Sequence, residues 1–305
     1  MSVATALPDA RESAIVFPCA TEELLGIVST PGGSTPAPTH GVLIVVGGPQ
    51  YRIGSHRMFV RLARHFAKSG VAAMRFDARG MGDGSGPRQY FEEFEEDIRA
   101  ALDAFFREVP SLRSVVIWGL CGGATAALLY MQGTRDPRVG ALALVNPWVR
   151  TDVTQAVTQV KHYYVQRLMQ ADFWRKLLRG GVAFASLGEL WRALRLTARA
   201  AAGARATGRA QVREGDSETD LGVRMARAWA GFAESGGRTL LILSERDYTA
   251  KEFLETAQMH PVWQVNFAHP LARRVNLPDA DHTFPQPEAH ALVERATLEL
   301  VATMP

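Results

Sequence analysis

Cysteine is scarce in this chain, which holds only Cys19 and Cys121 among its 305 residues. Two cysteines cannot build a framework of several disulfides, and neither belongs to a CxxC or Cys/His cluster of the kind that binds zinc. We therefore expect reduced thiols, no metal site and no other cofactor.

Long hydrophobic runs are missing as well. The longest strongly apolar stretches, 42–46 and 115–118, are far shorter than the roughly 20 residues that a membrane-spanning helix needs. Residues 1–17 lack the basic start and apolar centre of a secretory signal, so we expect a cytoplasmic protein. The composition, with 47% hydrophobic and 21% charged residues, is that of a globular protein.

Basic residues are concentrated in one segment. Positions 150–213 carry twelve Lys or Arg residues and three acidic ones, although the net charge of the whole chain is only +3. Such a segment fits a solvated helix face, contact with an anionic substrate or peripheral contact with a membrane. The basic residues match no nucleic-acid-binding motif, so we expect no nucleic-acid partner.

Apolar strand patterns alternate with amphipathic helix patterns along most of the chain. Short apolar strands that alternate with helices form parallel sheets covered on both sides, which predicts an α/β fold with a mostly parallel central sheet. The expected strands are 13–19, 24–29, 42–46, 71–76, 114–118, 139–145, 238–243 and 273–277. The expected helices are 55–68, 91–107, 122–131, one from about 250, and 287–302.

The alternation stops after Trp148, and residues 151–230 show helical patterns but no convincing strand. This predicts a core formed by 1–150 and 231–305, and a basic helical insertion at 151–230 that acts as a cap, or lid, over the site. Three aromatic residues of the insertion are candidates for substrate binding, or alternatively form the cap's own core: Tyr164, Trp174 and Trp191.

The segment Gly119–Gly123 reads Gly-Leu-Cys-Gly-Gly and stands between an expected strand and an expected helix. This G-x-C-x-G pattern is typical of a nucleophile elbow, in which a strained turn projects the central side chain above the sheet. Cys121 is therefore the candidate nucleophile. The alternative is an inert, packed thiol.

A thiol nucleophile needs a base, and the base needs a group that orients it. Asp247 follows the strand 238–243, and His282 ends the loop after the strand 273–277. The chain order is then Cys121, Asp247, His282, with Glu245 as the rival acid. Asp247 could instead cap the following helix, and His282 could be a loop histidine held by a neighbouring aspartate.

Acyl transfer also needs N–H donors for a developing oxyanion. Gly122, directly after the nucleophile, supplies one. The loop after 42–46 supplies the second, and since Pro49 has no N–H, Gly48 is the first choice and Gln50 the alternative. The glycine-rich loop 76–86 has no Walker lysine and no dinucleotide fingerprint, so we interpret it as structural.

Taken together, the Gly47-Gly48-Pro49 loop, the F-D-x-R-G-x-G-D stretch from Phe76, the elbow, Asp247 and His282 resemble the α/β-hydrolase superfamily. A cysteine at the elbow resembles the dienelactone hydrolases, which use a Cys-His-Asp triad. Three segments are similar to the exosortase A system-associated hydrolase 1 family, namely 47–56, 75–83 and 118–123. That resemblance implies an α/β-hydrolase fold and a bacterial hydrolase linked to exosortase and exopolysaccharide gene clusters.

The leading hypothesis is a cysteine-dependent hydrolase that cleaves a small-molecule carboxylic ester, lactone or thioester through an acyl-thioester on Cys121. The second is an acyltransferase that uses the same acyl-enzyme. The third is a non-catalytic binding protein that keeps the hydrolase fold.

Overall fold

The computed structural model describes residues 10–33, 36–149 and 220–305. The chain divides into two units: Met1–Val149 together with Arg224–Pro305 forms the first, which contains the sheet, and Arg150–Val223 forms the second. Residues 150–219, which hold most of the predicted cap, lie outside the described residues, as do Tyr164, Trp174 and Trp191.

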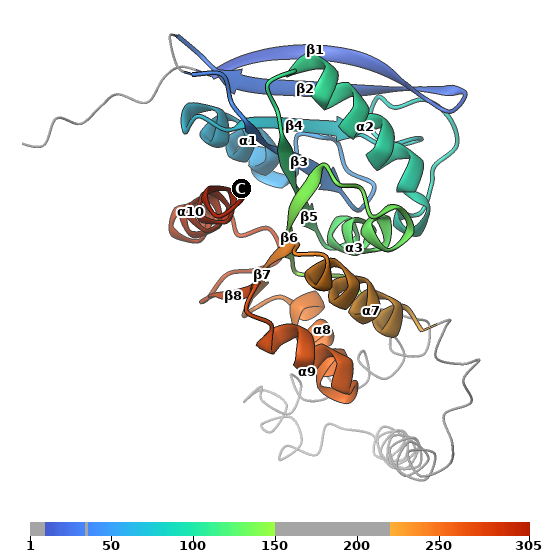
Figure 1. Cartoon of the computed structure of the whole chain (residues 1–305), viewed down its shortest axis with the longest axis vertical. Helices are drawn as coiled ribbons and strands as arrows, with labels where there is room; N and C mark the ends of the chain where they lie inside the picture. The colour runs from blue at the N-terminus through green and yellow to red at the C-terminus, as the bar shows by residue number, and fades with distance from the viewer. Residues whose placement is uncertain (1–9, 34–35, 150–219) are drawn as a thin grey trace, which may run out of the picture. The chain divides into compact units, whose positions relative to one another are not determined.

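An eight-stranded sheet with the order β1-β2-β4-β3-β5-β6-β7-β8 forms the centre of the first unit (Figure 1). β1 and β2 form an antiparallel hairpin, β2 runs antiparallel to β4, and every other pair of neighbours is parallel. The carboxyl ends of β3 to β8 therefore share one edge of the sheet. The strands are β1 Ala10–Cys19, β2 Glu22–Pro31, β3 His40–Val46, β4 Ala72–Asp77, β5 Ser114–Leu120, β6 Val139–Val145, β7 Arg238–Ser244 and β8 Ala272–Leu277.

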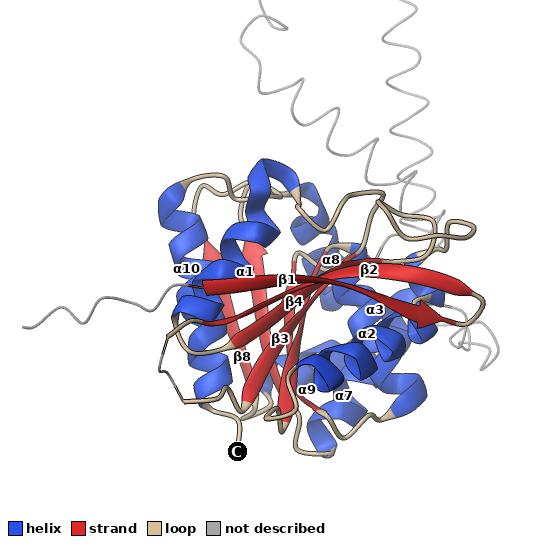
Figure 2. Ribbon diagram, turned by 90° about the horizontal axis from the view of Figure 1, so that it is seen from above, coloured by secondary structure: helices blue, strands red, loops and turns tan. Residues whose placement is uncertain are grey.

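Helices cover both faces of the sheet: α1 and α10 lie on one side, and α2, α3 and α7 on the other (Figure 2). This explains why β3 and β5 are buried at six consecutive positions, since a strand covered on both faces has no solvent side. The helices are α1 Met58–Lys68, α2 Glu95–Glu108, α3 Gly122–Thr134, α7 Leu221–Glu234, α8 Tyr248–Met259, α9 Pro261–Ala268 and α10 Pro287–Ala302, with short 3₁₀ turns η1 Ser55–Arg57 and η2 Phe91–Glu93. The predicted mostly parallel α/β sheet is confirmed.

Several predicted boundaries differ from the structure. The helix expected from residue 55 begins at Met58, because His56 and Arg57 have left-handed φ angles of 52° and 59°. The helix expected from 91 begins at Glu95, after η2. α9 was not predicted: Pro261 starts this short helix directly after α8, and a proline at the first turn marks a helix start that the apolar pattern does not reveal. α7 contains residues 230 and 231, between which the sequence places the border of cap and core; this division of the chain stays a prediction.

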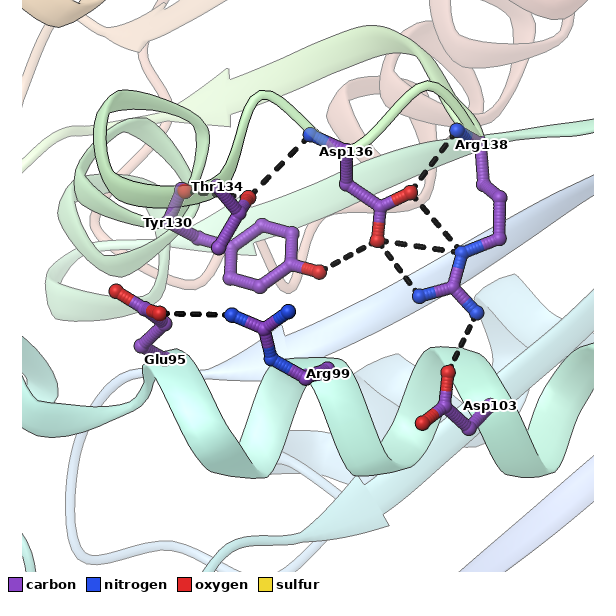
Figure 3. Close-up of polar contacts among 7 residues, drawn as sticks. All are labelled: Glu95, Arg99, Asp103, Tyr130, Thr134, Asp136 and Arg138. Carbon is purple, nitrogen blue, oxygen red and sulfur yellow. Dashed lines mark hydrogen bonds and ion pairs between the residues drawn. The ribbon is translucent and has the colours of Figure 1, made fainter.

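A polar network fixes the C-terminal end of α3 (Figure 3). The Tyr130 hydroxyl donates to Asp136 Oδ2 at 2.6 Å, and Arg138 donates both to Asp136 and, at 2.6 Å, to Asp103 on α2. Burial raises the pKa of the Asp136 carboxyl, but the hydrogen bonds from Arg138 and Tyr130 outweigh it and the pKa is lowered. The network therefore holds an ionised carboxylate at the end of α3 opposite to Cys121. Asp136 also lines a cavity of about 540 Å³ there, between α3 and α7.

Candidate active site

Cys121 stands between β5 and α3 in a strained conformation, with φ 58° and ψ −122°. Such backbone geometry is rare for a residue with a side chain, and it persists only where the surroundings impose it. Here the N–H of Cys121 donates to the carbonyl of Val145, at 2.9 Å. A Cβ atom on Gly119 would lie only 2.3 Å from backbone atoms of Gly123, so strand and helix pass too closely for any larger residue. The local geometry is that of a nucleophile elbow.

Asp247, directly beyond β7, is the carboxylate that contacts His282. Its Oδ2 lies 2.8 Å from His282 Nδ1, while its Oδ1 accepts the N–H of Thr249 at 3.1 Å. The second contact makes Asp247 the N-cap of α8. The two interpretations offered by the sequence, triad acid and helix cap, therefore describe one buried carboxylate with two contacts. Glu245, the rival acid, is exposed.

His282 follows β8 and its side chain is one-third exposed. Burial lowers the pKa of its imidazole, but the hydrogen bond to the Asp247 carboxylate and the nearby Cys121 sulfur outweigh this and raise the pKa to about 10. The arrangement therefore favours an imidazolium between the carboxylate and the sulfur. A cation beside a cysteine stabilises the thiolate, which is the nucleophilic form.

The candidate oxyanion donors lie on two segments that touch each other. Gly122 is the first residue of α3, so its N–H has no acceptor within the helix. A Cβ on Gly47, in the loop after β3, would lie 1.7 Å from the nitrogen of Gly123, which shows how closely this loop is packed against the elbow. In the same loop the N–H of Gln50 already donates to the carbonyl of Gly48, at 2.6 Å. This favours Gly48 over Gln50 as the second donor.

Arg52 anchors the loop after β3, a role that the sequence reasoning missed. Its N–H donates to Asp77 Oδ1 at 2.6 Å, and its guanidinium binds Asp77 Oδ2 and, at 2.8 Å, Asp83 Oδ2. The Asp77 side chain is fully buried at the end of β4. An aspartate directly after an apolar strand is a sequence signal for such an anchor, but its partner is 25 residues away in the chain.

The glycine-rich loop 76–86 is a packed structural element. Arg79 makes charge-assisted hydrogen bonds to Asp97 of α2, whose side chain is fully buried. At Gly82, which has φ 54°, a Cβ would lie 2.3 Å from the carboxyl carbon of Asp77. The loop therefore wraps a buried carboxylate.

Three exposed side chains with large apolar surfaces lie on segments that leave the carboxyl edge of the sheet. Tyr51 and Ile53 follow β3 and are 52% and 43% exposed, and Tyr248, next to Asp247, is 47% exposed. No sequence pattern marks these residues as substrate contacts. The aromatic candidates from the sequence all lie in the predicted cap, namely Tyr164, Trp174 and Trp191.

Within the residues that the structure describes, no group of three or more His, Cys, Asp or Glu side chains could hold a metal ion. No helix in those ranges has the length and apolar character needed to cross a membrane.

The sequence matches the model of the family described as "Serine aminopeptidase, S33" over residues 37–206. A search of curated protein sequences found no match.

Solved structures with a similar fold include an esterase of Pyrococcus furiosus, with 13% identity, a TM-score of 0.61, and 95% of this chain and 92% of that chain covered. A protein of Butyrivibrio proteoclasticus solved with ferulic acid bound has 14% identity and a TM-score of 0.57, with 95% and 100% covered. A serine hydrolase without a lid from Xanthomonas campestris has 12% identity and a TM-score of 0.54, with 97% of both chains covered. At such identities the likeness shows the fold, and the predicted α/β-hydrolase fold is confirmed.

Proposed function

Because the family match covers more than half of the chain, this protein belongs to the serine aminopeptidase (S33) family of α/β hydrolases, and we propose that it is a hydrolase that acts on esters through Cys121. The names of the family and of one structural neighbour refer to serine, whereas this chain has cysteine at the elbow. The observation that carries the proposal is the contact of His282 with the buried carboxylate of Asp247, near Cys121 at the strained turn.

The proposed reaction has two steps. The Cys121 thiolate attacks the acyl carbonyl, the N–H groups of Gly122 and Gly48 stabilise the oxyanion, and His282 gives its proton to the leaving alkoxide or thiolate. His282, now neutral, takes a proton from water as the water attacks the thioester, and the acid leaves while the thiolate and imidazolium are restored. Asp247 orients the ring and stabilises its charged form.

The proposed substrate is a small-molecule ester, lactone or thioester with an apolar or aromatic acyl group. Tyr51, Ile53 and Tyr248 supply apolar surface at the edge where Cys121 lies. One structural neighbour is an esterase, and another was solved with an aromatic acid bound. From the sequence we further propose a cytoplasmic location and a cap at 151–230 that contains the aromatic candidates. The resemblance to the exosortase A system-associated hydrolase 1 family supports the further proposal of a bacterial origin with a link to exosortase systems.

The test measures hydrolysis of activated esters by wild type, Cys121→Ala and Cys19→Ala. Cys19 is the matched control, because it is buried and because burial and the charge of Asp97 raise the pKa of its thiol to about 11. We expect Cys121→Ala to lower kcat/KM by at least about 10³-fold and Cys19→Ala to leave it unchanged.

Turnover by Cys121→Ala equal to wild type would contradict the proposal. Turnover that requires an added alcohol or amine would identify an acyltransferase instead. Absence of any Cys121-dependent turnover would favour a non-catalytic binding protein.

A further inference from the structure

Asn146 is an unusual residue next to the candidate triad. It directly follows β6, has no exposed surface and has a left-handed φ of 44°, although Pro147 follows it. A residue before proline prefers extended backbone, and a buried amide must satisfy its hydrogen-bonding groups within the protein. Its conformation and burial together call for specific partners.

All polar groups of the Asn146 side chain have such partners. Oδ1 accepts the backbone N–H of Ser244 at 2.8 Å, and Nδ2 donates to Ser244 Oγ at 3.0 Å and to the carbonyl of His282 at 3.3 Å. Its backbone N–H donates to Ile242 at 2.9 Å, which extends the β6–β7 ladder by one bond. The side chain thus joins the ends of two strands to the loop that carries the candidate base.

The segment around Asn146 also touches the elbow. The carbonyl of Val145 accepts the N–H of Cys121 at 2.9 Å, and the N–H of Trp148 donates to the carbonyl of Cys121 at 3.3 Å. On the acid side, the carbonyl of Ser244 accepts the N–H of Asp247 at 3.2 Å. The backbones of Cys121, Asp247 and His282 are therefore each linked, through one or two hydrogen bonds, to Asn146 or to a residue next to it in the chain or bonded to it.

We propose that Asn146 is a positioning residue that sets the place of His282 relative to Cys121 and Asp247; this inference rests on the proposed function. The loop of His282 has a further anchor two residues earlier, where the N–H of Arg246 donates to Ala280 at 3.0 Å. The Asn146 bond holds the backbone of His282 itself. Because displacement of a catalytic group by about 1 Å can cost about 10² in rate, this bond controls kcat.

Two variants of Asn146 test the proposal. Asn146→Asp keeps the size and one acceptor but replaces the N–H donor by an oxygen that faces the His282 carbonyl. Asn146→Gly removes the side chain, and glycine tolerates the positive φ at this position. This second variant therefore still tests the proposal if Asn146→Asp fails to fold. The matched control is Asn266→Asp, because Asn266 is also a buried amide that donates to a carbonyl, that of Ala226 at 2.8 Å, on elements away from the triad.

The measurements are kcat and KM for an activated ester and the pH dependence of Cys121 alkylation by iodoacetamide, each well below the melting temperature of the variant. We expect both Asn146 variants to lower kcat by about 10- to 100-fold with little change in KM. We expect Cys121 in both variants to be alkylated more slowly than in wild type, because the displaced imidazole no longer lies beside the sulfur. Asn266→Asp lowers the melting temperature but leaves kcat and alkylation at wild-type values.

The inference would be overturned if the folded Asn146 variants kept wild-type kcat and alkylation, whether or not their melting temperature fell. Failure of both variants to fold would also overturn it. If Cys121→Ala is inactive in the same assay, the proposed function still stands in each of these cases. If Cys121→Ala keeps full activity, the proposed function fails first and the inference fails with it.

Discussion

At the scale of residues, Asp247 shows how one side chain serves two purposes. One carboxylate oxygen contacts His282 and the other caps α8. Asparagine is also a good N-cap but carries no charge, so Asp247→Asn separates the two roles. We expect it to lower kcat by about 10²- to 10⁴-fold, and to lower the melting temperature less than Asp247→Ala does, because it keeps the cap of α8 and loses only the charge beside His282.

Asp247→Ala removes the cap as well and should cost about 1 kcal/mol of stability in addition. Glu245→Gln is the control, because it removes a negative charge from an exposed residue at the same strand end; it should leave kcat unchanged. A variant Asp247→Asn with normal kcat would show that the carboxylate only caps the helix.

The raised pKa of His282 predicts how stability depends on pH. The pKa is about 10 in the folded protein against an ordinary value of 6.5. Below pH 6.5 the ring is protonated in both the folded and the unfolded state, so its stabilising contribution is fully present. Between pH 6.5 and 10 only the folded state keeps the proton, so stability falls with rising pH and the contribution is lost above 10. Urea unfolding at pH 6, 8 and 10 should show a smaller decline in His282→Gln than in wild type; equal declines would contradict the raised pKa.

The candidate triad could be proposed from the sequence because each member lies in the segment that follows a predicted strand, and parallel strands bring these segments together at one edge of the sheet. Gly48 is also the first choice of second donor from the sequence, with Gln50 as the alternative, and the bond from the Gln50 N–H to Gly48 O supports that order. Asn146, by contrast, was not predicted. Its partners lie 98 and 136 positions away, and no local pattern indicates them.

At the scale of elements, the contact between the loop after β3 and the elbow is essential to the account. A Cβ on Gly47 would lie 1.7 Å from the Gly123 nitrogen, so Gly47→Ala must push the loop away from Cys121. Loss of one oxyanion donor costs about 10²- to 10³-fold in kcat, and we expect a loss of that size together with a lower melting temperature.

Gly231→Ala is the matched control, because a Cβ at this position in α7 meets nothing within 4 Å. It should stabilise the protein by about 0.5–1 kcal/mol and leave kcat unchanged. Wild-type kcat in Gly47→Ala would mean that the loop contributes no donor.

Elements with strong periodic patterns were predicted well, and their ends were not. The helix predicted over 55–68 includes three residues that form η1, because the backbone at His56 and Arg57 turns left-handed. The opening hairpin was placed correctly but is longer than predicted, since β1 begins at Ala10 and β2 extends to Pro31. Solvent-exposed strand ends carry polar residues that break the apolar pattern, although the β1–β2 ladder continues there.

At the scale of the whole molecule, the sequence separates a basic segment, 150–213, from an acidic remainder of the chain. Contact with an anionic surface is one of the possibilities that the sequence offers for this segment, beside a face that contacts only solvent, and such a contact would be electrostatic. Charge reversal at three arginines of this segment, Arg192, Arg195 and Arg199, should reduce the fraction of protein that sediments with phosphatidylserine vesicles. Added salt should reduce the sedimented fraction of the wild-type protein in the same way. Unchanged vesicle binding would indicate a face that contacts only solvent.

The acyl-enzyme on Cys121 is the central claim, and intact-protein and peptide mass spectrometry tests it most directly. Wild type, Cys121→Ala and Cys19→Ala are mixed with p-nitrophenyl acetate and quenched in acid during turnover. The account predicts one acetyl group on the Cys121 peptide of wild type and Cys19→Ala, labile to neutral hydroxylamine, and none at that position in Cys121→Ala. Rapid ester hydrolysis that persists in Cys121→Ala would contradict it.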